Sequence, residues 1–178
     1  MDSFGTLTAP RTVRFERLLP GPIENVWAYL VESDKRAKWL ASGPLEPKVG
    51  GALHWKWNHA DLSPIKRETP DRFKEFDCGH EMSGKVLRCE PPRLLTITWS
   101  KREDYSEVTF ELAERGDKVL LTLTHANLPD RAQTLGVSGG WHTHLDVLVE
   151  YLEGRTPPYF WDMFAKMGDA YEKRIPQG

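Results

Sequence analysis

The chain lacks several features that mark specialised classes of protein. Among its 178 residues there are only two cysteines, Cys78 and Cys89, and no CxxC motif, so no disulfide framework is expected. No run of eighteen apolar residues occurs, and we therefore expect no membrane-spanning helix. The first residues, MDSFGTLTAPR, have no apolar stretch of the kind that a signal peptide requires. These absences predict a cytoplasmic protein.

An excess of charge of either sign is also missing. Lys and Arg together number 24 and Asp and Glu 26, which gives a formal net charge of −2. Nucleic-acid binding usually requires a basic face, so we expect neither a nucleic acid nor a membrane as partner. No motif points to a cofactor, and none is expected. The length suits one domain with a substantial core.

Tryptophan, in contrast, is abundant. The chain has seven, at positions 27, 39, 55, 57, 99, 141 and 161. Each indole buries a large apolar area. This number indicates either a broad aromatic core or a cavity with aromatic walls, and the sequence does not separate the two.

The apolar pattern predicts an α+β domain over residues 12–154. Two short helices, around 22–32 and 33–40, follow the first predicted strand, and the first has an apolar stripe at helical spacing. Alternating apolar residues and short turns predict an antiparallel series of strands. The predicted strands are 12–19, 52–58, 84–90, 93–100, 106–112 and 118–126.

A long helix is predicted between Pro129 and Gly154. Its apolar stripe consists of Val137, Trp141, Leu145, Leu148 and Leu152. Three glycines, at 136, 139 and 140, each disfavour a helix by up to about 1 kcal/mol relative to alanine. They make sense if the helix bends or if its backbone approaches the sheet closely. We therefore expect a long helix lying across a curved sheet.

Three segments fall outside this pattern. Residues 1–11 are predicted to be a flexible tail, and the polar segment 59–82 a long loop, either a lid or a solvated insertion. Residues 155–178 are predicted to hold one more helix, from about Tyr159 to Arg174. Its apolar stripe is Phe160, Phe164, Met167 and Tyr171, with Trp161 and Met163 off the stripe. We expect it to pack on the domain or on a second copy, in a homodimer.

The order of these elements resembles the helix-grip fold of the START-like (SRPBCC) superfamily. The short sequence motifs are similar to those of the branch of activators of heat-shock-chaperone ATPase. The pieces that carry the resemblance are Val26-Trp27, Lys38-Trp39, Gly50-Gly51, Gly84-Lys85-Val86-Leu87, Pro91-Pro92-Arg93-Leu94, Trp99, Gly140-Trp141 and Gly154-Arg155-Thr156-Pro157. The resemblance implies a curved antiparallel sheet wrapped around a long C-terminal helix, with a hydrophobic cavity between them. It also implies varied functions, among them lipid or hormone binding, polyketide cyclisation and chaperone contact.

The sequence gives weak support for metal binding or nucleophilic catalysis. His142 and His144 would point about 200° apart on a helix, so they cannot share a metal there. Cys78-Gly79-His80 with His59 and Asp61 is only a loose grouping, and no metal site is expected. Ser138 in GVSGG lies at a helix start, without the preceding strand that a nucleophile elbow requires.

Two histidines are candidates for acid–base chemistry. His125 ends the apolar face of a predicted strand, and His144 lies beside the apolar stripe of the long helix. Each either acts as a general acid or base at the cavity or is a hydrogen-bonded core residue, and the pattern does not decide between these roles.

The main functional expectation is a binding site for a small hydrophobic molecule. The predicted lining residues are Trp39, Trp55, Trp57, Trp99, Phe110, Leu121, His125, Val137, Trp141, His144, Leu145 and Leu148. Two alternatives remain open: an enzyme of cyclase or hydrolase type that uses the cavity histidines, and an interaction module that contacts a chaperone through its outer surface.

Overall fold

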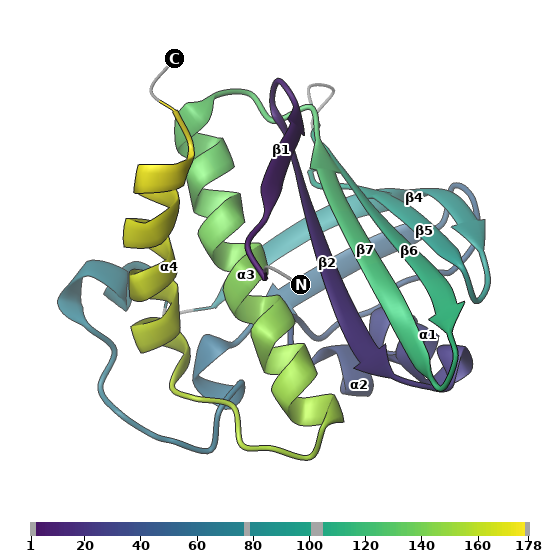
Figure 1. The fold of residues 1–178 in the computed structure, drawn as a ribbon, viewed down its shortest axis with the longest axis horizontal. Helices are drawn as coiled ribbons and strands as arrows, with labels where there is room; N and C mark the ends of the chain where they lie inside the picture. The colour runs from purple at the N-terminus through teal and green to yellow at the C-terminus, as the bar shows by residue number, and fades with distance from the viewer. Residues whose placement is uncertain (1–2, 77–78, 101–104, 177–178) are drawn as a thin grey trace.

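The computed structural model describes residues 3–76, 79–100 and 105–176. These residues form a seven-stranded sheet with strand order β1-β2-β7-β6-β5-β4-β3, in which every neighbouring pair is antiparallel (Figure 1). The strands are β1 (Thr6–Ala9), β2 (Thr12–Pro20), β3 (Ala52–Trp57), β4 (His80–Glu90), β5 (Leu94–Thr98), β6 (Glu107–Arg115) and β7 (Lys118–Ala126). The helices are α1 (Ile23–Val31), α2 (Ser33–Arg36), η1 (His59–Asp61), η2 (Asp71–Phe76), α3 (Arg131–Leu152) and α4 (Phe160–Arg174).

The strands bury one face, as their alternating pattern predicts. In β7, Val119, Leu121, Leu123 and His125 are all buried, and the intervening residues lie on the other face. The register places Phe110 of β6 opposite Leu123, so the same face continues from strand to strand. The sheet is curved, and α3 lies across its buried face (Figure 1). This is the α+β helix-grip architecture expected from the sequence.

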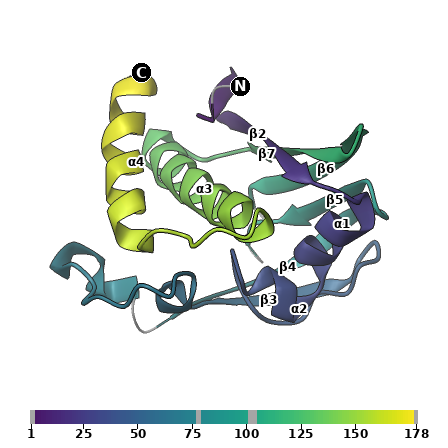
Figure 2. The same ribbon diagram turned by 60° about the horizontal axis from the view of Figure 1, so that its bottom comes forward.

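The long helix α3 is buried on two faces rather than one. Figure 2 shows α3 between the sheet on one side and α4 on the other. Trp141, Leu145 and Leu148 are buried, and so is His142, whose Nδ1 lies 2.9 Å from the Tyr171 hydroxyl of α4. Because both faces are covered, α3 forms the centre of the molecule.

Two of the three glycines of α3, Gly139 and Gly140, face α4 and not the sheet, which corrects the expectation of a close approach to the sheet. A Cβ at Gly139 would lie 3.6 Å from the backbone nitrogen of Gly168 and 3.8 Å from Cε2 of Phe164, both in α4. At Gly140 the nearest atom is again Cε2 of Phe164, at 4.0 Å. Small residues let two helices approach closely, so these glycines set the α3–α4 distance.

The N-terminal segment differs from the predicted flexible tail. Residues Thr6–Ala9 form β1, which pairs with β2 at the edge of the sheet. The backbone N–H of Gly5 donates to the Tyr171 hydroxyl at 2.7 Å, and Arg17 of β2 forms a 2.8 Å ion pair with Asp146 of α3. The N-terminal strand is therefore held both to the sheet and to the helical layer.

The segment between β3 and β4 packs against the region that follows α3. The Ser63 hydroxyl donates to the carbonyl of Pro157 at 2.8 Å, and Arg67 pairs with Asp162 of α4 at 2.7 Å. The described part of this segment, which contains η1 and η2, thus covers one end of the molecule. Strand β4 begins at His80, four residues before the predicted strand.

No helix within the described ranges is long and apolar enough to cross a membrane. The terminal helix α4 packs on α3 of its own chain, and dimer formation stays a prediction.

Candidate functional site

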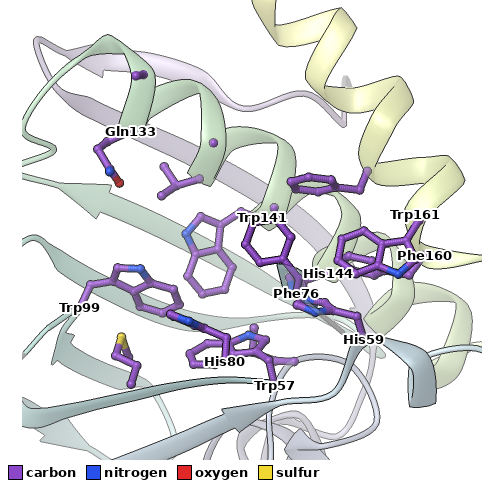
Figure 3. Close-up of a pocket in the computed structure, with 17 residues that line it drawn as sticks. Trp57, His59, Phe76, His80, Trp99, Gln133, Trp141, His144, Phe160 and Trp161 are labelled. Atoms are coloured by element: carbon purple, nitrogen blue, oxygen red, sulfur yellow. The ribbon is translucent and has the colours of Figure 1, made fainter. Parts of the chain in front are cut away.

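A cavity of about 570 Å³ lies where the sheet, α3, α4 and the segment between β3 and β4 meet (Figure 3). This volume falls within the range of roughly 300–1,000 Å³ typical of small-molecule sites. The lining residues are Leu40, Trp57, His59, Phe76, His80, Met82, Trp99, Ala132, Gln133, Gly136, Val137, Gly140, Trp141, His144, Phe160, Trp161 and Phe164.

Three tryptophans from different elements form the wall on the sheet side. Trp57 ends β3, Trp99 follows β5 and Trp141 projects from α3. The ring centroids of Trp57 and Trp99 are 5.8 Å apart, and those of Trp99 and Trp141 are 4.9 Å apart. Inclined aromatic pairs at these separations are favourable beyond their burial. The three indoles therefore form one continuous apolar surface.

Of the twelve lining residues predicted from the sequence, five lie in the cavity wall. These five are Trp57, Trp99, Val137, Trp141 and His144. The other seven lie in the packed core behind the wall: Trp39, Trp55, Phe110, Leu121, His125, Leu145 and Leu148. The alternation of the strands identifies the buried face correctly, but it does not tell which part of that face borders a void.

Two of the core tryptophans contact the short helices α1 and α2. The Trp39 indole N–H donates to the carbonyl of Tyr29 at 2.9 Å. The guanidinium of Arg36 lies 4.8 Å from the Trp55 ring centroid, in a cation–π arrangement. Their rings thus support the short helices α1 and α2 rather than face the cavity.

His125 has both of its ring nitrogens engaged. Its Nδ1 accepts from the Trp141 indole N–H at 3.0 Å, and Nε2 lies 2.8 Å from the Ser106 hydroxyl. Since Nδ1 accepts, the neutral ring carries its proton on Nε2 and donates it to Ser106. Burial lowers the pKa of His125 to about 3, so the ring is neutral near pH 7. These contacts engage both ring nitrogens and orient the Trp141 indole.

His144 has one ring nitrogen engaged and lines the cavity. Its Nδ1 lies 2.7 Å from the carbonyl oxygen of Trp39, which can only accept, so Nδ1 carries the proton. Burial lowers the pKa of His144 to about 4, against a smaller opposing effect of that hydrogen bond. The neutral ring therefore has its lone pair on Nε2, and the hydrogen bond of this ring to the described residues is made by Nδ1.

His59 lies beside His144 and was not among the predicted lining residues. Its ring centroid is 5.5 Å from that of His144 and 4.9 Å from that of Trp161. Burial, together with the neighbouring His144 and His80, lowers the pKa of His59 to about 3. Its Nδ1 is buried without a hydrogen-bond partner among the described residues.

The terminal helix supplies the remaining wall, which the sequence analysis did not anticipate. Phe160, Trp161 and Phe164 all line the cavity. Trp161 was placed off the apolar stripe of its helix, yet it is 2% exposed, because Phe73 of η2 stacks on it with ring centroids 5.0 Å apart. Helical periodicity identifies one buried face and misses a second face that a distant segment covers.

A metal centre has no support in the part of the chain that the structure describes. No group of three metal-ligating side chains comes together there. Cys78 of the loose grouping with His80 and His59 lies outside the described residues. Ser138 is fully buried within α3, where a substrate could not reach its hydroxyl.

The fold is that of the START-like (SRPBCC) class. The family model described as "Activator of Hsp90 ATPase homolog 1-like protein" matches residues 20–153, and the chain belongs to this family.

Solved structures support this assignment. The protein encoded by gene BPP1335 of Bordetella parapertussis is 46% identical, with a TM-score of 0.83 over 99% of this chain and 92% of that one. CalU16 of Micromonospora echinospora is 24% identical, with a TM-score of 0.66 over 96% and 93% of the two chains. EF2215 of Enterococcus faecalis is 19% identical, with a TM-score of 0.66 over 94% and 86%. The last two show similarity of fold alone, and no curated protein matches the chain.

Proposed function

We propose that the protein binds a small, predominantly apolar molecule in the cavity between the sheet, α3 and α4. The observation that carries the proposal is a cavity of about 570 Å³ whose wall includes Trp57, Trp99, Trp141, Phe160 and Trp161. Removing the apolar surface of a ligand from water favours binding by roughly 25 cal/mol per Å². Aromatic walls with a few polar groups are typical of such sites.

The fluorescence of the four tryptophans in the cavity wall reports ligand binding. We expect at least one member of a panel of fatty acids, flavonoids and polyketides to quench or shift their fluorescence saturably. Val137→Trp places a large ring in the cavity and should weaken this ligand at least about tenfold, since it occupies part of the ligand volume. Val149→Trp is the matched control, because Val149 lies in the same helix, is partly buried and does not line the cavity.

Two outcomes would contradict the binding proposal. The first is a panel in which no compound produces a saturable change. The second is stimulation of a chaperone ATPase, the activity named in the family description, that Val137→Trp leaves intact. Such a result would place the function on the outer surface instead.

Catalysis in the same cavity is a second candidate, favoured by His144. Its Nδ1 is held by the Trp39 carbonyl and its Nε2 is unpaired, which is the arrangement of an oriented general base. A pKa of about 4 makes His144 a weak base, so binding is the primary proposal. Mass spectrometry of the bound ligand after incubation with the protein tests this second candidate. Chemical conversion of the ligand by the wild type, but not by His144→Asn, would establish an enzyme.

A further inference from the structure

Three of the hydrogen-bonding side chains in the cavity wall lie together at one end. We call this the polar end and define it as His59, His144 and Trp161. Figure 3 shows these side chains on one side of the cavity, with Trp57, Trp99 and His80 toward the other. His80 and Gln133 also line the cavity, away from this end.

The polar end contains buried groups without partners. His144 is 6% exposed and presents the unpaired Nε2, an acceptor. The Trp161 indole N–H, a donor, and His59 Nδ1 are buried without a hydrogen-bond partner among the described residues. Those two atoms have almost no accessible surface, so Nε2 of His144 is the acceptor of this end for a ligand, and a hydrogen bond to it adds to what the apolar surface of the ligand provides.

The cavity wall selects against charge. None of its lining residues within the described ranges is Lys, Arg, Asp or Glu. An ionised carboxylate would lose its hydration there without meeting a cation, which is unfavourable. A fatty acid in its ionised form therefore fits poorly, and a neutral polar group fits well.

Resting on the proposed function, we infer that the ligand is a neutral, flat aromatic alcohol of the phenol type, whose hydroxyl donates to Nε2 of His144. The ring system lies along Trp57, Trp99 and Trp141, where stacked and inclined aromatic contacts are favourable. His144 is then the residue that determines specificity for a hydroxyl.

Three probes with the same ring system test this inference: 2-naphthol, 2-methoxynaphthalene and 2-naphthoate. The first carries a hydroxyl donor, the second lacks the donor, and the third is charged. We expect 2-naphthol to bind about tenfold more tightly than the methyl ether, the effect of one buried hydrogen bond, and 2-naphthoate to bind most weakly. Equal binding of 2-naphthol and its ether, or strongest binding of the naphthoate, would overturn the inference.

His144→Asn tests the role of the acceptor. Asparagine can keep an N–H donor toward the Trp39 carbonyl while it removes Nε2, so the preference for 2-naphthol over the ether should disappear. His54→Asn is the matched control, since His54 lies exposed on the outer face of β3. A preference that His144→Asn leaves unchanged would contradict the inference.

A measurement on the wild type covers the case in which His144→Asn does not fold. The ¹⁵N resonance of His144 Nε2 should move on addition of 2-naphthol and stay in place with the ether, and a resonance that moves equally with both would refute the hydrogen bond. If panel compounds bind but 2-naphthol does not, this inference fails and the proposed function stands. If no compound of any kind binds, the proposed function fails.

Discussion

His125 and His144 illustrate how the partners of two ring nitrogens decide what a buried histidine does. Both are buried and both have a lowered pKa. His125 has hydrogen bonds at both nitrogens and so fixes Trp141 and Ser106, whereas His144 keeps one lone pair at the cavity. The sequence places both correctly on buried faces. It could not separate their roles, because the partners come from elements distant in the chain.

The structural role of His125 leads to a prediction about stability. His125→Leu removes both hydrogen bonds and leaves the Trp141 N–H and the Ser106 hydroxyl buried without partners. We expect the free energy of unfolding to fall by roughly 1–3 kcal/mol for each orphaned group. Urea denaturation followed by tryptophan fluorescence measures this change. His54→Leu, at an exposed site, should stay within about 0.5 kcal/mol of the wild type, and a His125→Leu protein of equal stability would contradict the assignment.

Among the secondary-structure elements, α3 departs most from its predicted environment. Its extent is close to the predicted one, because both ends carry recognisable signals. At the start, the Asp130 side chain accepts from the Gln133 N–H, and after the end Gly154 has a φ of 71°. The partner of its glycines was not predicted. Glycine in a helix indicates a close approach, but only the tertiary structure shows that the approaching element is α4 rather than the sheet.

The glycines of the two helices therefore differ in what they tolerate. Added Cβ atoms at Gly136 of α3 and Gly168 of α4 meet nothing within 4 Å. Gly136→Ala and Gly168→Ala should each raise the free energy of unfolding by up to about 1 kcal/mol, because alanine favours the helix.

A larger residue at Gly139 should act in the opposite direction. Gly139→Leu would push the side chain into Phe164 and the backbone of Gly168, and overpacking of this kind costs roughly 1–3 kcal/mol. Thermal and urea unfolding of the three variants provide the comparison. Stabilisation by Gly139→Leu would show that the α3–α4 contact is looser than described.

At the scale of the whole molecule, the curved sheet and its central helix were predictable from sequence. Each strand has an apolar face with a period of two, and each face must be covered. The cavity could not be placed, because a void depends on the shapes of side chains from four separate segments. Trp55 and Trp57 occupy equivalent faces of β3, yet only Trp57 borders the void, since Arg36 covers Trp55.

The buried neutral histidines make stability depend on pH. The pKa values of His125 and His144 are lowered from 6.5 to about 3 and about 4, in both cases mainly by burial. Between those values and 6.5 the unfolded chain binds more protons than the folded one. Stability is therefore complete above pH 6.5 and falls as the pH decreases below it, by up to about 1.4 kcal/mol per pH unit for each histidine.

Urea denaturation at pH values of about 7, 6 and 5 tests this dependence. The wild type should lose stability steadily across the series, and His125→Leu should lose it less steeply, since one proton-binding difference is removed. A wild-type profile that is flat over this range would mean that the rings titrate normally in the folded protein.

The contribution of α4 to the cavity has a consequence for which substitutions change its shape. The family model ends at residue 153, whereas Phe160, Trp161 and Phe164 come after it. Part of the cavity wall thus lies beyond the residues that the family model matches. A substitution after residue 153 would therefore reshape this cavity without touching any strand of the sheet.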